Sequence, residues 1–140
     1  MKNIVLLLAL FMIIQVSFVN AQKKVKTSST AKVEIYYFHP TERCPIDQSI
    51  EENTRQTMQT YFSKEMKNGN VRLQILNTDD KTNAKLVAKF EINAQALYLV
   101  KIVNGKEMRT DLTSFAFDCG QSNPQKFRLR LKDEVESALK

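Results

Sequence analysis

The residues that can do chemistry begin at Cys44, at the end of the stretch YYFHPTERCPID (residues 36–47). A run of β-forming residues ends there in a short polar loop, and Cys44 enters a helical pattern. The amino end of a helix favours a cysteine as a thiolate, and Arg43 and His39 can add to this effect. Asp47, one helical turn on and on the same face, opposes it by like-charge repulsion. The residues indicate thiol chemistry. They leave open whether the surroundings of Cys44 favour or oppose its thiolate form.

Cys119 is the other cysteine of the chain. In an oxidising compartment one disulfide is the first interpretation of two cysteines, and two separate thiols are the alternative. With a single histidine, His39, and no cysteine-histidine cluster at zinc-ligand spacing, we expect no structural metal site.

Residues 1–21 have the pattern of a secretory signal peptide. Lys2 is followed by an apolar run from Ile4 to Val19, and Val19-Asn20-Ala21 has the small-residue spacing of a cleavage site. The run is shorter than the roughly 20 residues that a spanning helix needs, although an uncleaved anchor is the alternative. We therefore expect cleavage after Ala21, an exported protein, periplasmic or secreted, and no stable membrane span afterwards.

The rest of the chain has the size of one compact domain. Residues 22–31 are polar and basic and are expected to form a flexible lead-in, and residues 32–140 are expected to form the domain. The formal net charge of +6 falls to +5 without the leader, which holds one lysine and no acid. Charge of this size, spread over many lysines, is typical of a solvated surface, so we expect no nucleic-acid partner.

The hydrophobic pattern predicts seven elements in the domain. The predicted strands cover residues 32–38, residues 70–80, where the strand runs into an acidic turn, and residues 97–103 and 106–112, with Asn104-Gly105 as the turn of a hairpin. The predicted helices cover residues 45 to about 67, residues 82–90, and the residues after the helix cap Asn123. Residues Ile46, Ile50, Met58, Tyr61 and Phe62 of the first helix, and Phe127, Leu131, Val135 and Leu139 of the last, are expected to face the core. The phenylalanine-rich residues 113–122 are expected to form a loop.

This order of elements, β-α-β-α-β-β-α, limits the fold. Two strands joined by a helix are parallel with a right-handed crossover, and the hairpin adds an antiparallel edge. We therefore predict an α/β fold with a mixed four-stranded sheet and helices on both faces, which is the order of the thioredoxin fold.

From about Lys32 to Lys140 the chain resembles the thioredoxin-like superfamily. The segments that carry this resemblance are YYFHPTERC, before the nucleophile, and INAQALYLVKIVNGK, at the third strand and hairpin. More narrowly, YYFHPTERCP, SIEENTRQTMQTYF, ILNTDD and DLTSFAF with NPQKF resemble small exported thioredoxin-like proteins named nitrophenyl-compound nitroreductase subunits. The chain has no flavin or nicotinamide phosphate-binding loop and three glycines in total, so we expect neither nitroreductase activity nor a cofactor.

The resemblance places Cys44 at the first, nucleophilic cysteine of a Cys-x-x-Cys motif, next to Pro45. Asp47 stands where the resolving cysteine belongs, and Ala96 stands where the family has a cis-proline. A two-cysteine cycle within the motif is therefore impossible. In this fold the hairpin returns to the edge that holds the nucleophile, which makes a bridge from Cys44 to Cys119 a further prediction, either structural or redox-active.

Two functions remain open from the sequence. In the first, the protein works in thiol-disulfide chemistry, with Cys44 as nucleophile, Cys119 as distal partner and a thiol or protein as substrate. Whether it is an enzyme is undecided; if so, it is a thiol-disulfide oxidoreductase without Cys-x-x-Cys. In the second, it is an accessory module that binds a partner at the edge formed by residues 39–44, 95–97 and 111–117. A soft metal or metalloid ion on the two thiols and His39 is a minor alternative.

Overall fold

The computed structural model describes residues 31–140, so the predicted signal peptide and nearly all of the lead-in lie outside the described residues. The elements are β1 (Val33–His39), α2 (Pro45–Lys67), β2 (Val71–Asn77), the 3-10 turn η2 (Lys81–Asn83), α3 (Ala84–Lys89), β3 (Ala96–Val103), β4 (Lys106–Asp111), α4 (Thr113–Cys119) and α5 (Pro124–Leu139). Within residues 31–140, no helix has the length and apolar character needed to cross a membrane.

The four strands form one mixed sheet in the order β2-β1-β3-β4. β1 and β2 are parallel, and β3 is antiparallel to both of its neighbours, β1 and β4. This order with these directions is the thioredoxin-like arrangement, so the predicted fold class is confirmed. The register pairs Phe38, near the end of β1, with Ala96 at the start of β3. The sheet therefore brings the loop before α2 close to the segment that enters β3.

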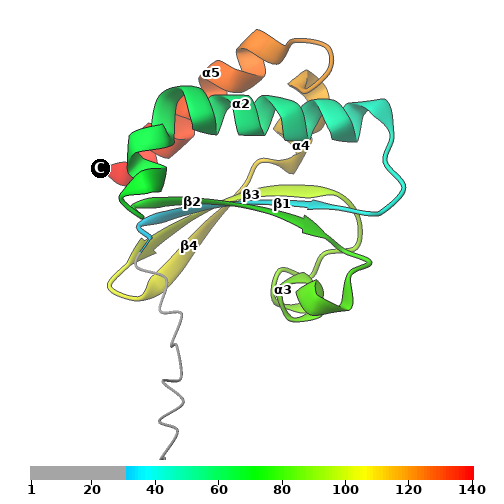
Figure 1. Cartoon of the computed structure of the whole chain (residues 1–140), viewed down its shortest axis with the longest axis horizontal. Helices are drawn as coiled ribbons and strands as arrows, with labels where there is room; N and C mark the ends of the chain where they lie inside the picture. The colour runs from blue at the N-terminus through cyan, green and yellow to red at the C-terminus, as the bar shows by residue number, and fades with distance from the viewer. Residues whose placement is uncertain (1–30) are drawn as a thin grey trace, which may run out of the picture.

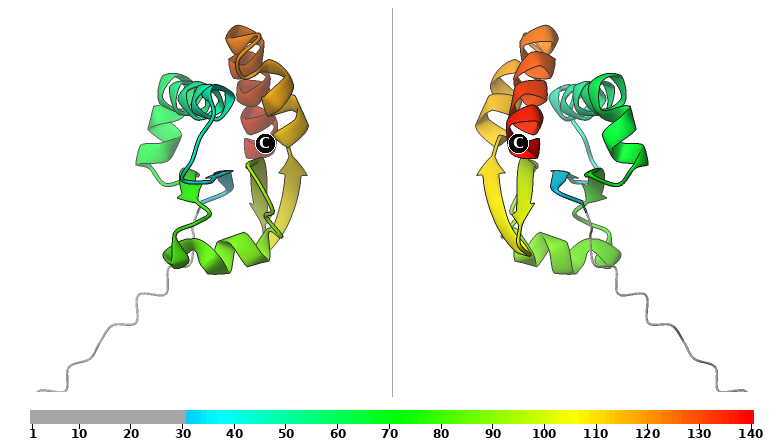
Figure 2. Two further views of the ribbon diagram at one scale, coloured as in Figure 1. Left: turned by 90° about the vertical axis from the view of Figure 1, so that its right-hand side faces the viewer. Right: turned by 90° about the vertical axis from the view of Figure 1, so that its left-hand side faces the viewer.

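Helices cover both faces of the sheet, as expected. α2, α4 and α5 lie on one face, and α3 lies on the other, below the carboxyl end of β1 (Figure 1). The end-on views show the same two unequal layers (Figure 2).

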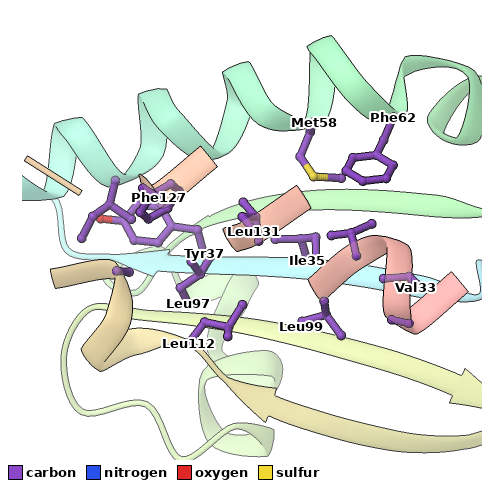
Figure 3. Close-up of a cluster of buried hydrophobic side chains, with 14 of the residues drawn as sticks. Val33, Ile35, Tyr37, Met58, Phe62, Leu97, Leu99, Leu112, Phe127 and Leu131 are labelled. Carbon is purple, nitrogen blue, oxygen red and sulfur yellow. The ribbon is translucent and has the colours of Figure 1, made fainter. Parts of the chain in front are cut away.

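The main core lies between the sheet and the three helices. Val33, Ile35 and Tyr37 alternate toward this side of β1 and meet Met58 and Leu131, among other buried residues (Figure 3). Tyr36 and Phe38 face the other way and pack in a smaller cluster with Phe90. β1 is thus buried on both faces, as its nearly continuous apolar sequence predicted.

The buried face of α2 is partly polar. Asn53, Thr54 and Thr57 are buried there, and each threonine hydroxyl donates to a backbone carbonyl one turn earlier, at 2.7 Å. The prediction that Tyr61 faces the core is wrong, because its side chain is 43% exposed. The backbone of Phe62 departs from helical geometry (φ −125°, ψ 17°) and Phe62 is buried. Successive helical residues point about 100° apart, so only one of the two enters the core.

Residues 113–119 form the helix α4, where the sequence predicted a loop. Asp111 Oδ1 accepts the backbone N–H of Thr113 at 2.8 Å, which fixes the start of α4. The Phe115 ring then stacks on the Phe127 ring at 5.5 Å between centroids, and Ala116 is buried. Aromatic and β-branched residues have modest helix propensity, so packing on α5 explains this helix better than local preference.

β4 is the last strand of the sheet order, and all six of its residues are exposed. It is held to the α3 side by Arg109, whose guanidinium carbon lies 4.2 Å from the centroid of the Phe90 ring. Lys89 of α3 also pairs with Glu107 of β4 at 2.5 Å. The edge of the sheet is therefore tied to α3 by polar and cation–π contacts.

Candidate functional site

Cys44 lies between the end of β1 and the first residue of α2. It is the residue that caps α2, with an extended backbone (φ −81°, ψ 167°), and its side chain is exposed. Pro45 follows at the first helical position, where the missing N–H costs no helical hydrogen bond. The loop enters α2 at the right-hand end of the sheet in Figure 1. The predicted position of the sulfur at the start of a helix is thus what the structure has.

The Asp47 side chain lies against the Cys44 sulfur and is fully buried. Its Oδ2 atom accepts the backbone N–H of Cys44 at 3.0 Å and the Cys44 thiol at 3.1 Å. The same oxygen accepts the side-chain amide of Gln95 at 3.1 Å. Oδ1 is buried and has no hydrogen-bond partner within the described residues. The carboxyl group at the position predicted for a resolving cysteine therefore contacts the sulfur directly.

The backbone of Asp47 is held by two further donors. The Tyr37 hydroxyl donates to the Asp47 carbonyl oxygen at 3.0 Å, and Arg43 Nη2 donates to the same oxygen at 3.4 Å. Burial raises the pKa of Tyr37, and the nearby charge of Asp47 raises it further. Tyr37 is therefore a neutral donor at physiological pH, and it fixes the first turn of α2 on β1.

Arg43 points along α2 and pairs with Glu51, whose other oxygen lies 2.7 Å from Arg55 Nε. Burial acts to raise the pKa of Glu51, but the hydrogen bonds from Arg55 and Arg43 outweigh it and the pKa lies below its usual value. These residues line an open hollow of about 510 Å³ along α2 whose lining residues are all polar or charged. The Arg43 guanidinium is thus engaged by Glu51 and by the Asp47 carbonyl.

His39 is the last residue of β1 and is half-buried. Its Nδ1 lies 2.8 Å from the carbonyl oxygen of Pro40, and its ring lies 5.9 Å from the Tyr37 ring. A carbonyl oxygen only accepts, so Nδ1 carries a proton in this contact. The predicted role of His39 as a tuner of the thiol stays a prediction.

Ala96 begins β3 and is buried at the predicted cis-proline position. The described part of the chain contains no cis peptide bond, so the bond before Ala96 is trans. The preceding residue, Gln95, turns its side chain to Asp47. Sequence reasoning placed Gln95 only within a candidate edge; its contact depends on the β1–β3 register, which no local pattern reveals.

The predicted bridge between Cys44 and Cys119 is not formed, and both cysteines are free thiols. Cys119 is buried at the end of α4. The carbonyl oxygen of the next residue, Gly120, accepts a hydrogen bond from the Asn53 side-chain amide at 3.0 Å. Gly120 lies so close to Ile50 that an added Cβ atom would meet the Ile50 side chain. The helix α4, expected as a loop, ends at Cys119 within the main core.

The minor alternative of a metal site on Cys44, Cys119 and His39 also gains no support. Among residues 31–140, no group of three or more histidine, cysteine or acidic side chains is placed to hold a metal ion. The structure therefore brings together Cys44, Asp47 and Gln95, with Arg43 and Tyr37 on the Asp47 carbonyl, and Cys119 is part of the main core.

No protein-family model and no curated protein matches the chain. Solved structures similar to it include the following two. One is described as a malarial protein, with 17% identity over 62% of this chain and 93% of that chain and a TM-score of 0.40. The other is a cysteine-to-serine mutant of a thioredoxin from Entamoeba histolytica, with 20% identity over 78% of this chain and 84% of that chain and a TM-score of 0.41.

Neither structure is named as a nitroreductase subunit, so the narrower resemblance gains no support. At these scores the fold assignment depends on the strand order and strand directions alone. By that criterion, residues 31–140 form a thioredoxin-like domain. Its one exposed cysteine precedes α2.

Proposed function

We propose that this protein is a single-cysteine thiol-disulfide exchange protein in which Cys44 is the nucleophile. The observation that carries the proposal is the exposed Cys44 sulfur at the amino end of α2, with the buried Asp47 carboxyl group beside it. Access to solvent is the first requirement of a reactive thiol. Because Cys119 is buried at the end of α4, Cys44 has no internal resolving thiol.

The reaction proceeds in two exchanges. In the first, the Cys44 sulfur attacks a disulfide R–S–S–R′, the Cys44–S–S–R bond forms, and R′–S⁻ leaves with the electron pair of the broken bond. The Cys44 thiol proton is released and the leaving thiolate takes one up. In the second, an external thiol R″–SH attacks the R sulfur of the mixed disulfide, the R–S–S–R″ bond forms, and Cys44 leaves as a thiolate that takes up the proton of the external thiol. The net reaction converts R–S–S–R′ and R″–SH into R′–SH and R–S–S–R″, and the protein returns unchanged.

The proposal includes export by the signal peptide of residues 1–21. Disulfide substrates persist in oxidising compartments, which is where this chemistry would be of use. Edman or mass-spectrometric sequencing of the amino terminus after expression in the native host tests this part. A mature terminus at Gln22 in the exported fraction would support it, and an intact Met1 in the cytosol would refute it.

The exchange itself is tested with 2-hydroxyethyl disulfide. We expect a mass gain of one hydroxyethylthio group on the peptide that contains Cys44, reversed by an external thiol. The gain should disappear in Cys44→Ser and persist in Cys119→Ser, which serves as the matched control. Failure of Cys44 to react with the disulfide would refute the proposal.

The alternative is an accessory module that keeps the fold and binds a partner without turnover. The trans peptide before Ala96 and the use of the Gln95 side chain within the site favour it, because substrate docking of the thioredoxin kind relies on a cis-proline there. An unreactive Cys44 together with a stoichiometric partner that protects residues 39–44 and 95–97 from hydrogen exchange would establish it. Nitroreductase activity is not part of either proposal.

A further inference from the structure

The Asp47 carboxylate is a buried charge without an ion-pair partner. Oδ2 accepts three hydrogen bonds, from the Cys44 N–H, the Cys44 thiol and the Gln95 amide. Each of these three groups donates, and the Oδ2 atom accepts, as a carboxylate oxygen does. No salt bridge of the described residues includes Asp47, and Oδ1 has no partner there.

The charged groups around Asp47 leave its charge unbalanced. Arg43 and Arg55 both pair with Glu51, so these three carry a net charge of +1. Glu42 is exposed in the loop before Cys44 and adds a negative charge. Tyr37 is neutral, since its pKa is raised by burial and by Asp47. The sum around the sulfur is therefore negative, on a chain whose formal net charge is +6.

We propose that Asp47 makes Cys44 selective for disulfides that carry cationic groups, ammonium or guanidinium, beside their sulfur atoms. This inference rests on the proposed function, since it concerns which disulfide the exchange takes. A cationic substituent supplies the counter-charge that Asp47 lacks. An anionic substituent adds a further negative charge to a site where the attacking thiolate and Asp47 already repel. Gln95 is a positioning residue, because its amide holds Oδ2 against the sulfur.

The size of this selectivity follows from Coulomb's law. Two unit charges about 6 Å apart change a rate by about threefold in a fully aqueous environment and by about a hundredfold at an effective dielectric constant near 20. Cys44 is exposed while Asp47 is buried, so we expect a value between these limits, about tenfold.

The test compares three disulfides of different charge: cystamine, which is cationic, 2-hydroxyethyl disulfide, which is neutral, and 3,3′-dithiodipropionate, which is anionic. Rates of mixed-disulfide formation at Cys44 are measured by peptide mass spectrometry at pH 7 for the full chain and for Asp47→Asn. For each reagent, the ratio of variant to wild-type rate cancels the intrinsic reactivity of the reagent. The matched control is Asp133→Asn, an exposed acid on α5.

We expect Asp47→Asn to accelerate the anionic disulfide about tenfold and to slow the cationic one about tenfold relative to the neutral reagent, and we expect no selective change in Asp133→Asn. An equal factor for all three reagents would overturn the inference and leave the exchange intact, because Asp47 would then act on the thiol alone. Failure of wild-type Cys44 to react with any of the three would instead refute the proposed function.

A second variant keeps the test decisive if Asp47→Asn does not fold. Gln48 is exposed in the first turn of α2, next to Asp47 in the chain. Gln48→Lys adds a positive charge there without touching the buried contacts. We expect it to accelerate the anionic disulfide relative to the cationic one by about threefold. An unchanged ratio would overturn the inference.

Discussion

The two cysteines of this chain occupy opposite kinds of helix end. Cys44 precedes the first turn of α2, is exposed and donates to a carboxylate. Cys119 closes α4, is 6% exposed and is part of the main hydrophobic core. A thiol at the start of a helix lies in a positive potential and can meet a substrate, whereas a thiol in an apolar core behaves as a small hydrophobic side chain. The two residues are of the same type, so it is their position in the fold that makes Cys44 available for chemistry and Cys119 a part of the packed core.

The largest expected effect comes from Cys44→Ser. This change should abolish mixed-disulfide formation completely, because serine is not a nucleophile toward disulfides. The free energy of unfolding should change by no more than about 0.5 kcal/mol, since Cys44 is exposed and serine is a good helix cap. Urea denaturation and intact mass after disulfide treatment measure the two quantities. A mixed disulfide that persists at Cys119 would break the contrast between the cysteines.

Gly120→Ala tests how tightly the Cys119 region is packed. An added Cβ atom would lie 2.6 Å from both the Ala116 carbonyl oxygen and Ile50 Cγ1, and Ile50 is fully buried. Overpacking of this kind costs about 2 to 3 kcal/mol. Urea denaturation should show this loss, while Ser114→Ala, an exposed change in α4, should show almost none. Unchanged stability of Gly120→Ala would mean that α4 can move away from α2.

Cys119→Ser should destabilise the protein by about 1 to 2 kcal/mol without changing exchange at Cys44. A buried hydroxyl group loses its hydration, and the core around Cys119 is apolar. Cys119→Ala is the control, because it removes the sulfur without adding a polar group. Equal destabilisation by the two changes would show that lost packing, and not the hydroxyl group, is responsible.

The smallest effect is expected at the edge of the site, from Glu51→Gln. The partly exposed pairs with Arg43 and Arg55 should contribute about 1 kcal/mol at neutral pH. Because the pKa of Glu51 is lowered on folding, this stabilisation is complete above its usual pKa near 4.5 and is lost as the pH falls through the folded value. The difference in unfolding free energy between wild type and variant should therefore shrink between about pH 5 and pH 3. A constant difference over this interval would argue against the ion pairs.

Much of the fold and the Cys44–Asp47 contact could be predicted from the sequence, because both depend on residues that are near one another in the chain. The strands and the long helices were predicted because apolar residues recur with clear periods, and Asn104-Gly105 forms the predicted turn with positive φ at both residues. The contact of Cys44 with Asp47 follows from three-residue spacing on a helix. These features depend on neighbours in the chain.

What could not be predicted depends on packing between distant segments. α4 forms on α5 in spite of weak local preference, and the position of Cys119 follows from it. Asn53 is buried because the Gly120 carbonyl and Arg128 supply its hydrogen bonds. No period in the sequence marks a polar residue that is buried for such reasons.

The exposed strand β4 has a consequence for the behaviour of the protein in concentrated solution. A strand at the border of a sheet offers its backbone to other molecules and can seed aggregation. Four of the six β4 residues are charged, with Lys106 and Arg109 among Glu107 and Asp111, and the strand is short. Pairing of further strands with β4 would bury these charges. The charged residues of β4 therefore disfavour aggregation through this edge of the sheet.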